Sequence, residues 1–211
     1  MTWLAVAVVR DGVALASHRE EGRDQAARLL PAIAETLRAA RVERRELSLL
    51  AVTIGPGSFT GVRVGLAAAR GLAVGLGVPL AGVSTTATLL AQATPHDRLV
   101  VAAVDSRLGD WFCAVSEGDP APFVTSTAEL AQRLKGRQSL IVGAEAETLA
   151  RSLEAAIGQT ALPDPIMLAR LASADGVERW RARNRADGLP RPLYLRGVSV
   201  TMPDGARRTV D

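Results

Sequence analysis

Residues 55–73 read GPGSFTGVRVGLAAARGLA and follow directly on the apolar run at residues 49–54. A short apolar run that ends at turn residues predicts a buried strand. Gly55 and Gly57 permit backbone conformations that other residues avoid, and Pro56 fixes φ between them, so a sharp turn is expected. The rest predicts a helix, and glycines inside a helix need a packing reason because each costs about 1 kcal/mol relative to alanine. This strand, turn and smooth helix indicate an α/β fold.

The turn matches none of the common catalytic or nucleotide-binding loops completely. A Walker A loop needs a lysine followed by serine or threonine, and the only lysine of the chain is Lys135. A nucleophile elbow needs a glycine two residues on either side of its serine, and Ser58 has neither. The three glycines are spaced one residue too long for a dinucleotide fingerprint. A helix N-terminus remains, at which Ser58 or Thr60 caps the helix or an anion binds, and we favour capping.

Composition excludes several classes of protein. The chain has 211 residues and is 48% hydrophobic, which is enough for one large domain or two small ones with real cores. No run approaches the roughly 18 to 20 apolar residues that span a bilayer, so we expect a cytoplasmic protein without a membrane segment. Cys113, the single cysteine, lies in an apolar run and reads as a buried hydrophobe. His18 and His96 lack partners at ligand spacing, so no metal site is expected.

The remaining pattern alternates strands and helices in two sections. An Asp-Gly pair at residues 11–12 between two apolar runs predicts an antiparallel hairpin. The polar residues 94–98 mark a boundary, which divides the chain into an N-terminal lobe at 1–95 and a C-terminal lobe at 96–211. The first lobe is expected to hold strands at 4–9, 13–17, 49–54 and 78–83 and helices at 26–40, 61–75 and 85–92. The second is expected to hold strands at 99–104, 111–116 and 140–142 and helices at 128–134, 145–157 and after Asp164-Pro165.

The C-terminal section is basic. Residues 176–211 contain eight arginines and four acidic residues, a net charge of +4, whereas the whole chain carries +3. Arginines at every second position around Trp180 could contact RNA. Alternate residues of a helix point about 200° apart, however, so these arginines do not form one stripe. Compositional bias toward arginine is the simpler interpretation.

Several stretches together resemble one known family. They are the glycine-rich segment quoted above, residues 27–31 (ARLLP), residues 104–107 (VDSR) followed by Trp111-Phe112, and residues 192–196 (PLYLR). In order and spacing they are similar to the TsaB (YeaZ) family, glycoprotease-like proteins of tRNA threonylcarbamoyladenosine biosynthesis. The resemblance implies the two-lobed actin-like ATPase fold, a duplicated ribonuclease H-like α/β arrangement. Relatives typically begin with one more strand, so we expect a sheet short of its first strand and of one phosphate loop.

The resemblance implies a non-catalytic partner of a TsaD-like paralogue, required for threonylcarbamoyl transfer to the adenosine beside the anticodon of tRNA. No intrinsic cofactor is expected, and ATP would be bound by partners or at the interface of the complex. A TsaE-like ATPase is the further partner, tRNA would be met through the complex, and the partner face could pair with itself in a homodimer. The metal-binding histidines of TsaD have no counterpart in the comparable residues 22–28.

The partner face is expected on the early helix and the glycine-rich helix, with Gly65 and Ala68 at the contact and Arg70 beside it. The interface residues are Leu29, Ile33, Gly57, Ser58, Phe59, Thr60, Gly61, Arg63, Val64, Gly65, Ala68 and Leu72.

The alternative is an enzyme in its own right, either a nucleotide-using transferase or a glycoprotease-like peptidase. The chain has no Ser-His-Asp or Cys-His set in a plausible motif and no complete phosphate loop. Asp105 is the one candidate acid, at the end of an expected strand, where an aspartate more often caps its own turn. No catalytic residue is therefore assigned.

Overall fold

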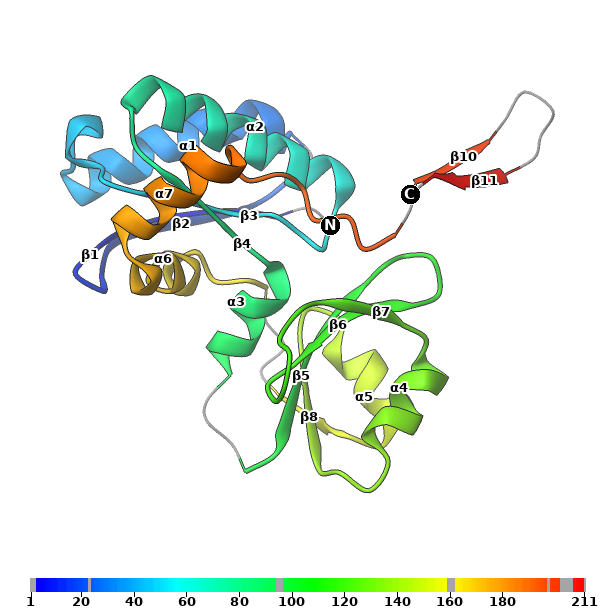
Figure 1. Cartoon of the computed structure of the whole chain (residues 1–211). Helices are drawn as coiled ribbons and strands as arrows, with labels where there is room; N and C mark the ends of the chain where they lie inside the picture. Colours follow the sequence, from blue (N-terminus) through cyan, green and yellow to red (C-terminus); the bar gives the residue numbers. More distant parts are fainter. Residues whose placement is uncertain are drawn as a thin grey trace.

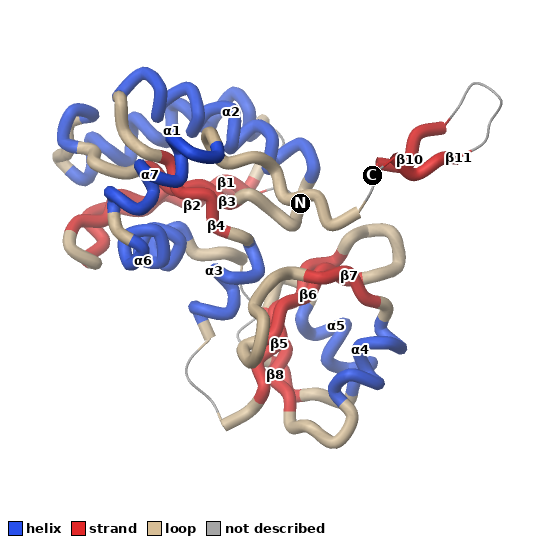
Figure 2. The backbone as a smooth tube through the Cα atoms, in the orientation of Figure 1, coloured by secondary structure: helices blue, strands red, loops and turns tan. Residues whose placement is uncertain are grey.

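The protein is a two-lobed α/β protein, as expected, seen here in a computed structural model (Figure 1). The structure describes residues 3–22, 24–93, 97–158, 162–196, 198–201 and 207–210. Each lobe has strands at its centre and helices on the faces, as Figure 2 shows. His96 and most of the expected boundary segment lie outside the described residues.

The strands of the first lobe form two separate ladders. β1 (Trp3–Arg10) and β2 (Val13–Glu21) pair antiparallel around the expected turn, at which Asp11 and Gly12 both have positive φ. β3 (Leu50–Thr53) and β4 (Leu80–Val83) pair parallel. Among the described residues no ladder joins β1 to β3.

Helices cover both faces of these strands. α1 (Gln25–Ala40) and α2 (Phe59–Leu76) lie side by side over one face, and α6 (Pro165–Asp175) lies on the other (Figure 1). α6 contacts β1, β3 and β4, and α7 (Val177–Asp187) contacts β4. The structure thus places α6 and α7, which follow the second-lobe strands in sequence, on the first lobe.

The second lobe is built on a five-stranded mixed sheet in the order β7-β6-β5-β8-β9. Its strands are β5 (Leu99–Asp105), β6 (Trp111–Val115), β7 (Phe123–Thr125), β8 (Ser139–Val142) and β9 (Ala156–Ile157). Alternate residues of β5 face opposite sides, as a strand requires. Val101 packs toward α4 (Thr127–Leu134) and α5 (Ala146–Leu153), whereas Val100 packs toward α3 (Thr85–Gln92).

One expected helix is shorter than its sequence pattern suggested. Residues 145–157 were expected to be helical, but α5 ends at Leu153 because Glu154 adopts a left-handed conformation. The chain then enters β9 beside β8. Three short elements complete the described structure: a 3-10 helix η1 (Arg44–Glu46) and the antiparallel pair β10 (Val198–Thr201) and β11 (Arg207–Val210).

A single asparagine joins α7 to the edge of the first-lobe sheet. The Asn184 side-chain oxygen accepts a hydrogen bond from Leu80 N at 2.7 Å, and its Nδ2 donates to Leu80 O at 3.0 Å. Leu80 itself is fully buried. The amide side chain therefore satisfies both backbone groups of Leu80, as another strand would at that edge of β4.

Replacing Asn184 with alanine should lower the free energy of unfolding by about 1–3 kcal/mol, because two buried backbone groups would lose their partners. The exposed neighbour Arg185 offers a control on the same helix, and Arg185→Ala should change stability by less than about 0.5 kcal/mol. Urea unfolding followed by circular dichroism measures both. Equal stability of the two variants would contradict the bridging role of Asn184.

Cys113 lies fully buried in the core between the sheet of the second lobe and α4 and α5. Burial raises the pKa of its thiol to about 12, since the apolar surroundings disfavour the thiolate. We therefore expect Ellman's reagent to leave the folded protein unmodified at pH 8 and to react fully in urea. The folded state should also lose stability above about pH 8.5, where only the unfolded thiol ionises. Rapid labelling of the folded protein would show that this core opens.

Candidate functional site

The glycine-rich turn is held from two sides at the end of β3. Gly55 has φ +102°, a conformation that favours glycine. Its carbonyl accepts a hydrogen bond from Thr85 N at 2.8 Å, and the preceding Ile54 carbonyl accepts one from Leu193 N at 2.8 Å. Ser58 caps α2, because its hydroxyl accepts a hydrogen bond from Gly61 N at 3.3 Å. Ser58 is therefore the N-cap residue of α2, as we expected.

The glycine-rich segment at residues 55–73 and the PLYLR segment at residues 192–196 meet beside this turn. The guanidinium of Arg63 donates to the Tyr194 hydroxyl at 2.8 and 3.2 Å and lies 3.6 Å from the centre of the Phe59 ring. The two aromatic rings are 6.4 Å apart and both are more than half exposed. Residues 131 positions apart in the sequence therefore build one exposed aromatic and arginine cluster at the start of α2.

The loop after β5 extends this arrangement to the second lobe. Arg196, the last residue of the PLYLR segment, forms an ion pair with Asp110. Ser106 donates its hydroxyl to the same carboxylate, and Ser106 N donates to Asp110 O at 3.1 Å. Arg107 reaches Glu145 with an Nη2–Oε1 distance of 2.6 Å. The C-terminal segment therefore ties the turn of the first lobe to a loop of the second.

The candidate catalytic groups are all engaged structurally. The Asp105 carboxylate accepts a hydrogen bond from Arg107 N at 2.7 Å, which is the self-capped turn that we considered the commoner case. Ser58 serves as a helix cap, and Cys113 is buried with a raised thiol pKa. His18 lies 3.1 Å from Glu20, whose pKa is held at about 2 chiefly by hydrogen bonds from Arg28 and then by His18. Within the described part of the chain, no group of three or more metal-ligating side chains occurs.

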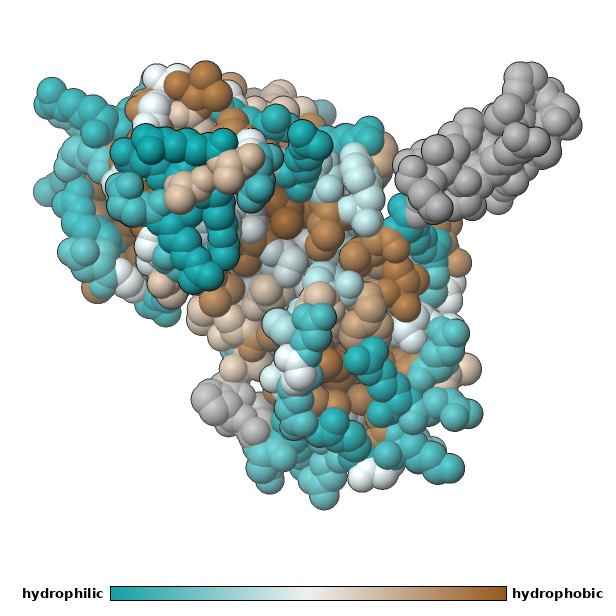
Figure 3. Space-filling model, in the orientation of Figure 1, coloured by the Kyte–Doolittle hydropathy of each residue, from teal (hydrophilic) through white to brown (hydrophobic). Residues whose placement is uncertain are grey.

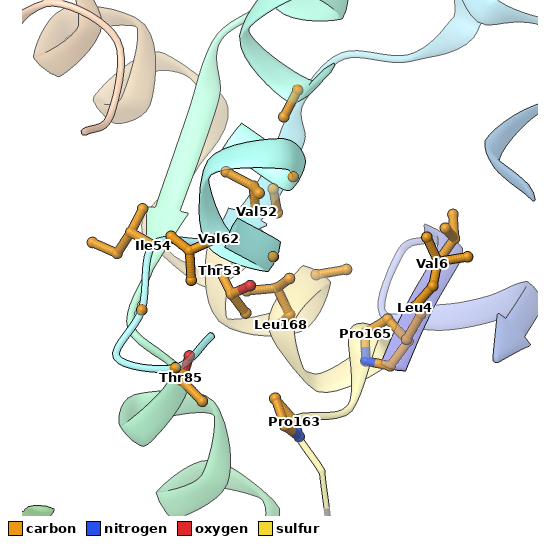
Figure 4. A pocket seen from close by; sticks show the side chains of 18 of the residues that line it. Leu4, Val6, Val52, Thr53, Ile54, Val62, Thr85, Pro163, Pro165 and Leu168 are labelled. Atoms are coloured by element: carbon orange, nitrogen blue, oxygen red, sulfur yellow. The ribbon is translucent and has the colours of Figure 1, made fainter. Parts of the chain in front are cut away.

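A cavity of about 1610 Å³ opens between these segments. It runs from the gap between β1 and β3 to the loops where the two lobes meet, and Thr85, Ser106 and Glu145 lie at that end. Figure 4 shows that the side chains at its first-lobe end are mostly aliphatic, with Val6 from β1, Val52 from β3 and Leu168 from α6.

All twelve residues expected at a partner interface line this cavity. Gly57, Ser58, Phe59, Thr60 and Arg63 are exposed, whereas the other seven are half-buried. A side chain added at Gly65 would meet Val52 of β3 at 3.7 Å. The structure therefore points Gly65 toward the protein's own strand rather than outward.

The outward face of α2 is carried by other residues. Ala67, Arg70, Gly71 and Gly75 are exposed, and Val74 is 73% exposed. Added side chains at Gly71 and Gly75 would meet nothing within 4 Å. On the neighbouring α1, Leu30 is 55% exposed and Arg28 is bonded to Glu20 of β2. Apolar residues are visible on the surface over α2 in Figure 3.

This exposure is unusual for so apolar a helix. By length and composition alone, α2 is the one described helix that could cross a bilayer, and only 11% of it is buried. It nevertheless packs on β3, with Leu66 and Ala73 in the core, and it carries Arg63 and Arg70. An exposed apolar face on a packed helix is a candidate contact surface for another molecule.

Three of the four arginines of α7 form ion pairs with acidic neighbours. Arg179 and Arg183 both contact Asp175, at 3.3 and 3.1 Å, and Arg181 contacts Glu178 at 3.7 Å. Arg183 also lies 4.7 Å from the centre of the Trp180 ring. These pairs fit a structural role for the basic helix.

Sequence reasoning missed the contacts that assemble the site. The pairs of Arg63 with Tyr194 and of Arg196 with Asp110 join distant segments. The only signal in the sequence was that both segments belong to the motifs of the resemblance. Gly71 and Gly75, which face outward on α2, were not among the expected interface residues. Small residues occur on both sides of this helix, so their spacing did not show which side faces outward.

Comparison with known proteins gives consistent results. The family model for TsaD, tRNA N6-adenosine threonylcarbamoyltransferase, matches residues 18–133, or 116 of the 211 residues. The tRNA threonylcarbamoyladenosine biosynthesis protein TsaB of Escherichia coli is 36% identical over 117 residues, which cover 54% of this chain and 51% of that protein. TsaB of Bacillus subtilis is 33% identical over 107 residues, 50% of this chain and 47% of that protein.

The chain thus spans about half the length of the curated relatives that it matches. The structural likeness extends further. The solved structure of YeaZ from Pseudomonas aeruginosa superposes with a TM-score of 0.73 at 25% identity and covers 92% of this chain and 94% of that one. Sequence match and fold agree, and the chain therefore belongs to the TsaD-like glycoprotease family with the actin-like ATPase fold, in its TsaB (YeaZ) group.

Proposed function

We propose that this protein is a non-catalytic partner of a TsaD-like paralogue in the threonylcarbamoylation of the adenosine beside the anticodon of tRNA. The observation that carries the proposal is the exposed apolar face of α2 beside α1, on a helix that is otherwise packed into its lobe. Exposed Val74 and Leu30 would be covered by the partner. The names of the relatives, which are biosynthesis proteins for this modification, support the tRNA context.

The chemistry of the described residues supports an accessory role. Ser58, Cys113 and Asp105, the candidate nucleophiles and acid, are occupied by capping, burial or turn formation. A subunit without its own reactive set can still act by fixing the shape of a catalytic partner. We therefore assign ATP and the reacting groups to the TsaD-like and TsaE-like partners or to their interface with this chain, and tRNA to the assembled complex.

Close helix packing is the physical basis of the proposed association. At Gly71 and Gly75 the outer side of α2 has no side chain, so a partner helix can approach its backbone there. Arg63, with Phe59 and Tyr194 around it, lies at one end of the same helix and could orient the partner. A second copy of this chain could use the same face in the absence of the paralogue.

Gly71→Leu separates folding from association. The new side chain enters open space and removes a helical glycine, so the unfolding free energy should stay level or rise by up to about 1 kcal/mol. Binding to the TsaD-like paralogue should weaken about tenfold or more, because the side chain overfills a close contact. Urea unfolding measures the stability, and isothermal titration calorimetry measures binding to the paralogue. Ala174→Leu, at an exposed position of α6, should leave binding unchanged. Normal binding by Gly71→Leu would exclude this face.

Reconstitution tests the function itself. This chain, the TsaD-like paralogue and the TsaE-like ATPase are mixed with tRNA, ATP and threonylcarbamoyl-adenylate, and each protein is omitted in turn. We expect the modified adenosine, quantified by mass spectrometry, to form only when this chain is present and never with this chain alone. Equal yield without it would refute the accessory role. Modification by the chain alone would favour an enzyme.

A further inference from the structure

Arg63 carries a positive charge that the described part of the chain does not neutralise. Its side chain donates hydrogen bonds to the Tyr194 hydroxyl, and no carboxylate of the described residues forms an ion pair with it. The two arginines nearby differ in this respect. Arg196, on the same segment as Tyr194, and Arg107, on the loop that Arg196 contacts, each pair with a carboxylate of the second lobe. The cluster at the start of α2 therefore presents one unpaired positive charge.

The neighbours of Arg63 hold its guanidinium in place without covering all of it. Nε and Nη2 donate to the Tyr194 hydroxyl at 3.2 and 2.8 Å, and Cζ lies 3.6 Å from the centre of the Phe59 ring. These contacts do not use Nη1, and all three side chains are exposed. The end of the guanidinium formed by Nη1 and Nη2 has the fork geometry that binds a carboxylate through two parallel hydrogen bonds. Because the side chain is already ordered, such binding costs little conformational entropy.

Exposed apolar surface surrounds this charge. Phe59 is 59% exposed and Tyr194 is 51% exposed. Leu108, two residues before Asp110 in the loop that pairs with Arg196, is 73% exposed. Tyrosine and arginine are enriched among the residues that contribute most to binding at protein interfaces, where surrounding contacts exclude water from them. The cluster thus has the composition of such a contact point.

The charge balance distinguishes between two classes of partner. A nucleic acid is held through several phosphates, which several cations must neutralise. Of the three arginines here, Arg107 and Arg196 are already paired, and Arg63 is not. The guanidinium of Arg63 also covers one face of the Phe59 ring, on which a base could otherwise stack. One acidic side chain of a protein matches this site better than an RNA does.

We propose that Arg63 binds an aspartate or glutamate side chain of the TsaD-like paralogue, and that Phe59 and Tyr194 form an apolar rim around this ion pair. Charge complementarity and the free guanidinium fork identify the occupant as a carboxylate. An ion pair covered by the partner is screened by salt much less than an exposed one. The inference rests on the proposed function, and it adds the chemistry of one contact to the close helix packing at Gly71.

Charge variants of the full chain test the ion pair. Arg63→Gln should weaken binding to the paralogue about tenfold, because a central interface arginine is lost. Arg63→Glu should weaken it about a hundredfold, because like charges would then face each other. Arg185→Glu, at an exposed position of α7 outside the cavity, is the matched control and should stay within about twofold of the unaltered chain. Isothermal titration calorimetry measures the affinities, and circular dichroism verifies that the variants fold.

Rescue distinguishes an ion pair from an indirect effect of Arg63 on the position of Tyr194. Each surface aspartate and glutamate of the paralogue is changed singly to arginine, and each product is titrated with Arg63→Glu. One of them should restore binding about tenfold. Raising the salt from about 0.1 M to about 1 M should also weaken the unaltered chain more than Arg63→Gln. This salt comparison does not require Arg63→Glu to fold.

The outcomes separate this inference from the proposed function. No binding of the unaltered chain to the paralogue would overturn both. Equal binding by Arg63→Gln, the same salt dependence for both chains, or the lack of any restoring paralogue variant would overturn the ion pair and leave the accessory role standing. If Arg63→Gln bound the paralogue normally but weakened tRNA binding by the complex, Arg63 would be assigned to a phosphate instead.

Discussion

Two backbone hydrogen bonds at the end of β3 organise the molecule. The carbonyl of Ile54 accepts the amide of Leu193, and the carbonyl of Gly55 accepts the amide of Thr85. The first bond fixes the C-terminal segment against the turn, and the second fixes the start of α3, from which the chain continues to the second lobe. The positive φ of Gly55 is what directs these successive carbonyls to two different segments. The start of α2, the path of the tail and the link between the lobes all depend on this turn.

The side-chain contacts around the turn reinforce that arrangement. Arg63 on α2 donates a hydrogen bond to Tyr194. Arg196, two residues after Tyr194, forms an ion pair with Asp110 in the second lobe. Single side-chain contacts near the surface contribute little individually, but here they act on a segment that backbone hydrogen bonds have already positioned. Such a network selects one relative placement of the lobes more than it adds to overall stability, which suits a protein whose proposed role is to shape a partner.

Local chemistry made much of the fold predictable from the sequence. The helices expected at 85–92 and after Asp164-Pro165 form and are capped by Ser84 and Asp164, and the Asp11-Gly12 turn forms the expected hairpin. Short-range signals could not show that α6 and α7 return to the first lobe, because that depends on long-range contacts such as Asn184 Nδ2 to Leu80 O at 3.0 Å. The sequence identified the helix that carries the candidate site, but it did not show which residues of that helix face outward. Gly65 and Gly71 look alike in the sequence, and only packing shows that one faces Val52 and the other faces open space.

The two faces of α2 carry different contacts. Its inner side packs on β3 through Leu66 and borders the cavity through Gly65 and Ala68, while its outer side presents Gly71 to a partner. The core contacts of Leu66 and Ala73 hold the helix in place before a partner arrives. Association on such a helix loses less conformational entropy than association on a mobile segment, so more of the contact energy is available for affinity.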